Sequence, residues 1–381
     1  MSSALVEKTT AQALLVARHV SAASTDRKLR ACYDGLRASQ LPFLVADDAS
    51  ALFRASFAAL FTLGQASVPL AVGFTMHQYM FAALASVRVA DKRLARRLKD
   101  LVDDVRKRRL LVAVSSFGAG VSTAHVRFTI ARDGDGFVFD GERSFQSMAS
   151  EADLITVVAP VDGGDLGAFI VPMKGRAGVT VHDAVFGGPM ALTDTRAVTF
   201  SGYRAVAADV VTLDAQHAHR LGAYSTAWFE ALIGAAYLGG AAAALEEVRL
   251  FARSARAPSG EPLHELDGAV VDAGRLGISL RTSLALAMSF VDALARGSEA
   301  DDFTSVMMAG TLLKYACTRS AEAIVTGARR LLGTRAMRQG SLMAELTGQI
   351  VFGPLHPWLE AELERAVGAD VLGDAPFVAL G

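Results

Sequence analysis

The chain has 381 residues, of which 52% are hydrophobic and 20% are charged, and its formal net charge is −1. This length is sufficient for two or three domains with a large core, and the balanced charge gives no basis for a nucleic-acid or acidic-membrane partner. No segment has about 18 uninterrupted apolar residues, so the sequence predicts no membrane span and a cytoplasmic protein. The two cysteines, Cys32 and Cys317, lie far apart and outside any metal-ligand spacing, which favours reduced thiols.

Residues 1–109 have an almost purely helical pattern. Apolar residues recur at helical spacing in 4–20 and 47–87. His77 lies in the second of these segments, and a buried histidine within a helical layer is favoured over a ligand contact. Segment 92–109 mixes basic and acidic residues at helical offsets, which predicts an exposed helix face with i,i+4 ion pairs. A site for coenzyme phosphates is the less favoured alternative there.

Residues 110–214 predict a set of short strands separated by glycine and aspartate turns. The sequence Asp133-Gly134-Asp135-Gly136 predicts a hairpin turn, because glycine adopts the positive φ that such turns need. The predicted strands, which are β-branched or aromatic, are 127–130, 137–139, 154–158, 168–171, 179–181 and 196–200.

From residue 215 onward the pattern is helical again. Segments 225–256, 266–295 and 303–332, with a shorter one after Ser341, have the lengths of an up-and-down bundle. Segment 231–244 is rich in alanine and glycine, which predicts a close helix approach in a packed core or at an oligomer interface.

The order of these parts and several motifs resemble the acyl-CoA dehydrogenase superfamily. The motifs are 115–120, which stands where the family has a Thr-Glu-Pro-x-Ala-Gly loop, 133–147, 260–267 and Leu332-Gly333. The resemblance covers most of the chain.

This resemblance implies an α+β fold of three parts. They are an N-terminal helical domain (1–109), a middle β-barrel or β-sandwich domain (110–214) and a C-terminal four-helix bundle (215–381). It also implies that the cofactor pocket is completed across a subunit interface, and therefore a homodimer or homotetramer.

The resemblance implies a flavin cofactor, FAD, with FMN as the alternative. Phe145 would lie on the flavin ring, and Ser147 would reach N5 and the pyrimidine edge. FMN is kept because the family's Arg-x-x-Phe-Gly motif has Ser259 at its Phe position and the later glycine loop is altered. The implied cofactor-binding residues are Ser115, Phe117, Gly118, Gly120, Phe145, Ser147, Arg256 and Gly333.

The catalytic base is where the sequence departs from the family pattern. One usual glutamate position is Phe229, with Glu230 one residue away, and the other falls at His356-Pro357. A general base works best when its pKa lies near the working pH. Burial can raise the pKa of a carboxylate toward that range, and the pKa of a histidine already lies near neutral pH. The candidate catalytic residues are therefore His356 and Glu230.

Three functions remain open at this point. The first is a flavin-dependent oxidoreductase that dehydrogenates an acyl thioester at its α,β-bond, carried by coenzyme A or a carrier protein. The second is a flavin-dependent monooxygenase of the same fold, supplied by a flavin reductase, because segment 353–357 resembles that branch. The third is a non-redox protein that has lost or repurposed the flavin site. The dehydrogenase is placed first, because His77 with its neighbour Met76 and segment 260–267 resemble that branch.

Overall fold

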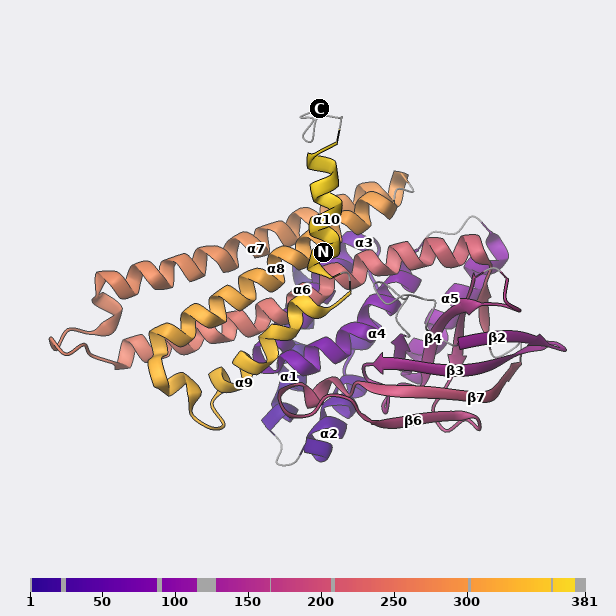
Figure 1. The fold of residues 1–381 in the computed structure, drawn as a ribbon, viewed down its shortest axis with the longest axis horizontal. Coiled ribbons are helices and arrows are strands. Elements are labelled where there is room, and N and C mark those ends of the chain that lie inside the picture. The colour runs from indigo at the N-terminus through magenta and orange to yellow at the C-terminus, as the bar shows by residue number, and fades with distance from the viewer. Residues whose placement is uncertain are drawn as a thin grey trace.

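In the computed structural model, the described residues are 2–21, 25–87, 91–114, 128–164, 166–206, 210–300, 303–357 and 359–373. The strands lie at one end of the molecule and the long helices extend from them to the other end (Figure 1). The N-terminal helices are α1 (Ser2–Ala17), η1 (Arg18–Ser21), α2 (Thr25–Ala38), η2 (Leu41–Phe43), α3 (Ala49–Ala66), α4 (Val68–Ser86) and α5 (Lys92–Arg108).

Side-chain caps define where these helices begin. Asp48 accepts a hydrogen bond from Ala51 N–H at the start of α3, and Ser67 accepts one from Leu70 N–H at the start of α4. Such caps satisfy backbone donors that have no partner within the helix. The expected ion pairs on α5 are present and exposed, for example Lys99 with Asp103 at 2.6 Å.

Two four-stranded sheets form the β part. One has the order β1-β4-β5-β8 and the other β2-β3-β7-β6, and all pairings are antiparallel except β1 with β4. All six predicted strands are confirmed over the residues that the structure describes, as is the hairpin, where Asp133 pairs with Gly136 and Gly134 has φ 61°. The strands are β1 (Val112–Val114), β2 (Phe128–Asp133), β3 (Gly136–Gln146), β4 (Leu154–Pro160), β5 (Leu166–Pro172), β6 (Val179–Ala184), β7 (Arg196–Val206) and β8 (Val211–Leu213), with the helical turn η4 (Gly188–Thr193) before β7.

Long helices dominate the C-terminal part. The first of them begins ten residues earlier than predicted, because Asp214 accepts a hydrogen bond from His217 N–H and caps it. The elements are α6 (Ala215–Ser254), η6 (Leu263–Glu265), α7 (Asp267–Ala300), α8 (Phe303–Leu332), η7 (Gly333–Met337), α9 (Leu342–Gln349), η8 (Ile350–Leu355) and α10 (Glu360–Val371).

The Ala/Gly-rich segment of α6 is a packed core within one chain. A Cβ on Gly64 of α3 would lie 2.3 Å from the carbonyl oxygen of Ala236, and one on Gly239 would lie 2.2 Å from that of Phe61. The two backbones are therefore in contact, and larger residues would separate the helices. Of the two interpretations offered for this segment, the packed core is confirmed.

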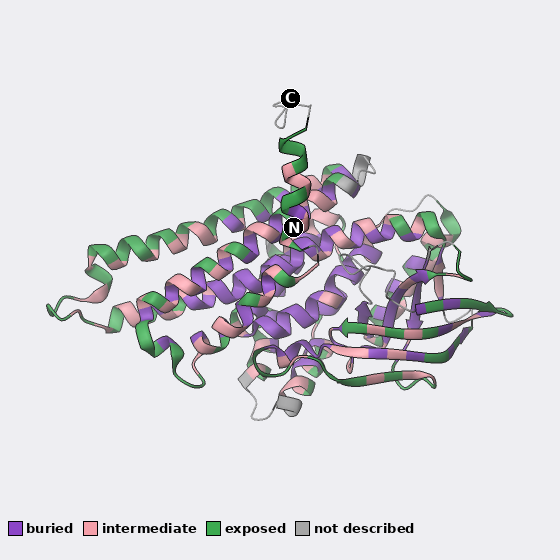
Figure 2. Ribbon diagram, viewed as in Figure 1, coloured by how far each residue is buried: buried purple, intermediate pink, exposed green. Residues whose placement is uncertain are grey.

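Three helices are apolar and long enough to cross a membrane by length and composition alone: Val68–Ser86, Ala215–Ser254 and Asp267–Gly297. In α4 and α6 the apolar window is 89% and 83% buried inside the fold, which explains its composition. In α7 only 28% is buried, and Val270, Val271 and Ile278 are exposed. Figure 2 shows this contrast between the buried α6 and the largely exposed α7.

Candidate functional site

Strand β3 ends in a tight bend that leaves the Phe145 ring exposed. Phe145 has φ 59° and Met148 has φ 62°, in the left-handed region that residues other than glycine rarely adopt. The bend is held against the end of η4, because Met148 N–H donates to Thr193 O (2.8 Å) and Ala149 N–H donates to Asp194 O (3.1 Å). Phe145 is 58% exposed, and an exposed ring on a fixed backbone is suited to stacking on a planar ligand.

The Ser147 hydroxyl begins a chain of hydrogen bonds that leads into the protein. Ser147 Oγ lies 2.9 Å from Thr195 Oγ1, and Thr195 Oγ1 lies 2.8 Å from Thr193 Oγ1. Thr193 in turn donates to the carbonyl oxygen of Met190 at 2.9 Å. Both threonines are buried, whereas Ser147 is half-buried. Ser147 is therefore the member of this hydroxyl chain that is open to a ligand.

Three phenylalanine rings connect this bend to the C-terminal part. Phe145 stacks on Phe186 with ring centroids 5.9 Å apart, and Phe186 meets Phe352 edge-on at 5.3 Å. Phe186 follows β6, and Phe352 belongs to η8. The rings thus bring together residues that are more than 200 positions apart in the sequence.

Just after η8, His356 meets the helices of the bundle. A Cβ on Gly353 would lie 3.0 Å from Thr318 Cγ2 and 3.5 Å from Tyr237 Cδ1, so a glycine here allows η8 to pack against α8 and α6. His356 Nε2 lies 2.8 Å from the Tyr237 hydroxyl, and its ring meets Phe229 edge-on at 6.2 Å.

The segment around His356 is also held by a buried ion pair. Lys314 Nζ lies 2.9 Å from Glu230 Oε2, and the two side chains are 2% and 1% exposed. The same ammonium donates to His356 O at 3.0 Å and to Pro357 O at 2.7 Å. Burial lowers the pKa of Lys314, while the Glu230 charge opposes this shift. One lysine therefore ties α6, α8 and the 356–357 backbone together.

This arrangement changes the interpretation of the two candidate bases. Burial, with the Lys314 charge as a second cause, lowers the pKa of His356 to about 3, far from the near-neutral value expected from the sequence. Glu230 is close to His356, as expected, but its carboxylate is held in an ion pair inside the bundle and is therefore poorly placed to reach a substrate.

His77 has the structural role that the sequence favoured. Its Nδ1 accepts a hydrogen bond from Val112 N–H at 3.0 Å, so Nε2 carries the proton and donates to Pro42 O at 2.6 Å. Burial lowers the pKa of His77 to about 4. The neutral ring thus joins α4 to β1 and η2.

Two of the remaining residues implied by the resemblance, Arg256 and Gly333, do not lie at this bend. Arg256 lies in the α6–α7 connection, where its guanidinium donates to Gly260 O at 2.8 Å, and Gly333 begins η7 with φ 63°. Both connections are at the end of the bundle away from the strands (Figure 1). The expected residues Ser115, Phe117, Gly118 and Gly120 lie outside the described residues.

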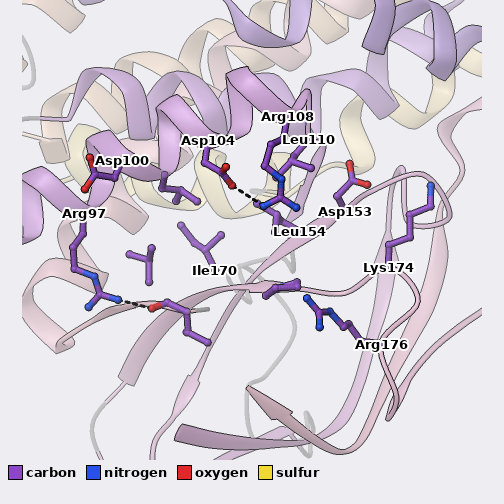
Figure 3. Close-up of a pocket in the computed structure, with 14 residues that line it drawn as sticks. Arg97, Asp100, Asp104, Arg108, Leu110, Asp153, Leu154, Ile170, Lys174 and Arg176 are labelled. Atoms are coloured by element: carbon purple, nitrogen blue, oxygen red, sulfur yellow. Dashed lines mark hydrogen bonds and ion pairs between the residues drawn. The ribbon is translucent and has the colours of Figure 1, made fainter. Parts of the chain in front are cut away.

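A hollow of about 550 Å³ lies elsewhere, between α5 and the β1-β4-β5-β8 sheet (Figure 3). Three of the four basic side chains that line it are already engaged: Arg97 donates to Val210 O at 2.6 Å, Arg108 pairs with Asp104 at 2.9 Å, and Lys174 lies 3.8 Å from Glu151. Opposite charges alternate along its helical wall, as on the solvated helix face that the sequence predicted, so we do not assign it to the cofactor.

Two comparisons found no relative in sequence: no family model and no curated protein matches the chain. Solved structures match over nearly the whole length. FMN-bound TdsC from Paenibacillus sp. A11-2, described elsewhere as a dibenzothiophene monooxygenase, has a TM-score of 0.81 at 20% identity and covers 97% of each chain. KijD3 in complex with FMN and a dTDP-linked amino keto sugar has a TM-score of 0.79 at 20% identity, covering 99% of this chain and 95% of that one.

Butyryl-CoA dehydrogenase from Megasphaera elsdenii has a TM-score of 0.79 at 14% identity and covers 98% of both chains. The chain therefore has the acyl-CoA dehydrogenase-like fold, as the sequence predicted. This fold is shared by a CoA dehydrogenase and by FMN-bound proteins, so the activity must be argued from the site.

Several residues of this site were not predicted. The fold, and no local sequence pattern, brings three of them into the site: Thr195, Phe186 and Phe352. Lys314 left a clearer signal, since it is a lone charge in an apolar helix segment, as Glu230 is in α6. Two such lone charges of opposite sign in neighbouring bundle helices indicate a buried pair.

Proposed function

We propose that the protein is a flavin-dependent monooxygenase that uses reduced flavin and oxygen to oxidise a small organic molecule. The observation behind this proposal is the buried ion pair between Glu230 and Lys314. Dehydrogenation of an acyl thioester needs a base that removes the α-proton, and both candidate bases are poorly suited to it. A monooxygenase has no such requirement, and TdsC and KijD3, which share the fold, are both described with FMN.

The residues at the β3 bend fit a flavin. Phe145 offers an exposed ring for stacking, and Ser147, two residues further along the bend, offers a half-buried hydroxyl. When bound, the flavin supplies the oxygen activation, and the protein supplies position and exclusion of water. His356, which is half-buried, would orient the substrate as a neutral hydrogen-bonding group, and the fully buried Tyr237 hydroxyl, 2.8 Å from its Nε2, would hold the imidazole ring.

The cofactor is proposed as FMN or FAD. Within one chain, the described residues around Phe145 provide a site for the flavin ring. Arg256 and Gly333, which were expected to bind the dinucleotide part of FAD, lie at the far end of the bundle. FAD that reaches them would therefore need a second subunit. Chromatography of the flavin released from purified protein identifies which one is bound.

A homodimer or homotetramer is part of the proposal. The apolar side chains of α7 support it, since Val270, Val271 and Ile278 are 50%, 43% and 65% exposed. Several exposed apolar side chains on one helix are consistent with an interface. A separate flavin reductase in the cytoplasm would supply the reduced flavin.

The test separates the candidate activities by their need for oxygen. Protein loaded with oxidised flavin is mixed anaerobically with acyl thioesters, and protein loaded with reduced flavin is mixed with ¹⁸O₂ and small aromatic compounds such as indole. We expect ¹⁸O in the product of the second reaction and no loss of flavin colour in the first. Anaerobic bleaching by an acyl thioester would establish the dehydrogenase instead. Colourless protein that binds neither FAD nor FMN would support the non-redox alternative.

A further inference from the structure

We propose that Thr193 and Thr195 fix the direction of the Ser147 hydroxyl, so that the site binds reduced flavin more tightly than oxidised flavin. This inference rests on the proposed flavin function. It concerns which redox state the site selects, and it assigns positioning roles to two threonines that make no contact with the ligand themselves.

The direction of the hydroxyl chain follows from its inner end. The Met190 carbonyl can only accept, so Thr193 uses its single hydroxyl proton to donate to it. Thr193 Oγ1 must then accept from Thr195, and Thr195 Oγ1 must accept from Ser147. Each hydroxyl has one proton, and all three are used within the protein. Ser147 therefore has only lone pairs left for a ligand.

The backbone keeps the chain in this geometry. Thr193 and Thr195 are 1% and 3% exposed, so no bulk water is available to replace a missing partner. The carbonyl of Thr193 accepts from Met148 N–H at 2.8 Å, which fixes the distance between the two segments. If the chain reversed, Thr193 would no longer donate to Met190, and a hydrogen bond would be lost in a buried place.

An acceptor at this position distinguishes the two flavin states. Oxidised flavin has a bare nitrogen acceptor at N5, whereas reduced flavin has an N–H donor there. The ring's other edge donor, N3–H, is present in both states. Ser147, which the sequence resemblance puts at N5 or at the pyrimidine edge, can thus bond N5 only when the flavin is reduced. A site of this kind suits an enzyme that takes up reduced flavin from solution.

The experiment measures the dissociation constants of oxidised and reduced FMN, the latter anaerobically, for the wild type and three variants. Thr195→Val removes the acceptor that holds the Ser147 proton, with little change in shape, and frees Ser147 to donate outward. Ser147→Ala removes the hydroxyl itself. Thr199→Val is the matched control, because Thr199 lies on β7, four residues after Thr195, but its hydroxyl bonds the exposed His182.

We expect wild-type protein to bind reduced FMN more tightly than oxidised FMN. Thr195→Val should shrink that ratio about tenfold, the scale of one hydrogen bond, by strengthening binding of the oxidised form. This change lowers the midpoint potential of the bound flavin by about 30 mV. Ser147→Ala should shrink the ratio by weakening binding of the reduced form, and Thr199→Val should leave it unchanged.

Two results overturn the inference while leaving the proposed function intact. One is that Thr195→Val changes both affinities equally, which would mean that Ser147 meets N3–H. The other is that Ser147→Ala weakens only the oxidised form, which would mean that the hydroxyl donates outward. Failure of the wild type to bind flavin in either state would instead refute the proposed function and the inference with it.

Discussion

Replacing Lys314 with methionine tests the buried ion pair most directly. Methionine keeps the length of the side chain but removes its charge, which leaves the Glu230 carboxylate, 1% exposed, without its ammonium partner. Breaking a buried pair on one side costs about 3–5 kcal/mol. The bonds to His356 O and Pro357 O are lost as well, at about 1 kcal/mol each. We therefore expect Lys314→Met to destabilise the protein by about 5 kcal/mol or more.

The double variant Lys314→Met, Glu230→Met separates charge from packing. Replacing both members of a buried pair by apolar side chains is often close to neutral, so only the two lost carbonyl bonds should remain, about 2 kcal/mol. The double variant should thus be more stable than Lys314→Met alone. Urea unfolding followed by the helix signal in circular dichroism measures both, with the helix fraction at zero urea checking that each variant folds.

Lys99→Met is the matched control, because Lys99 pairs with Asp103 at 2.6 Å but is 74% exposed. Exposed pairs contribute little, so its urea midpoint should equal that of the wild type. If Lys314→Met also unfolds at the wild-type midpoint, or if the double variant is less stable than the single one, the pair is not closed and buried as described. Glu230 would then stand again as the candidate base.

Three further predictions concern other parts of the fold. Because the pKa of His77 is lowered from 6.5 to about 4, the unfolded chain binds a proton that the native state does not, and the free energy of unfolding should fall by about 3 kcal/mol as the pH drops from 6.5 to 4. Urea unfolding of His77→Gln should show a smaller fall over this pH range, and the same fall as in the wild type would contradict the buried neutral ring. Gly64→Ala should destabilise the protein by about 1–3 kcal/mol, because the added Cβ clashes with Ala236 O. Gly274→Ala in α7, where a Cβ meets nothing within 4 Å, should stabilise the protein by up to about 1 kcal/mol, and equal melting temperatures of the two variants would refute the close α3–α6 contact. Ile278→Arg should convert an oligomer to a species near 40.1 kDa in light scattering, and a wild-type monomer would remove the case for α7 as an interface.

The β part was predictable because its longer strands are rich in β-branched and aromatic residues and its turns contain glycine and aspartate. The two strands that were missed, β1 and β8, have three residues each, too few to show a period. The start of α6 was placed ten residues late, because His217, His219 and Arg220 interrupt the apolar pattern there. Asp214, a good capping residue, was the signal that could have corrected it.

The site was predictable only in part, because its members meet through strand register and helix packing. Phe145 and Ser147 were found from a motif that is continuous in sequence. The bond between Ser147 and Thr195 joins residues 48 positions apart, and the contact of Lys314 with the 356–357 backbone depends on how η8 packs on the bundle. Such pairings follow from side-chain shape at Gly353 and Thr318, which no local pattern encodes.

The contact between Gly64 and Ala236 also has a consequence for synthesis of the chain. The two residues are 172 positions apart (236 − 64). At a translation rate of about 5–20 residues per second, the part of α6 that covers α3 is therefore synthesised roughly ten to thirty seconds after α3. During this time Phe53, Leu60 and Leu63, which are fully or almost fully buried in the finished protein, have no α6 to pack against. The N-terminal helices are therefore the part of the nascent protein that most needs a chaperone, and a stall in translation of the β segment lengthens their exposure.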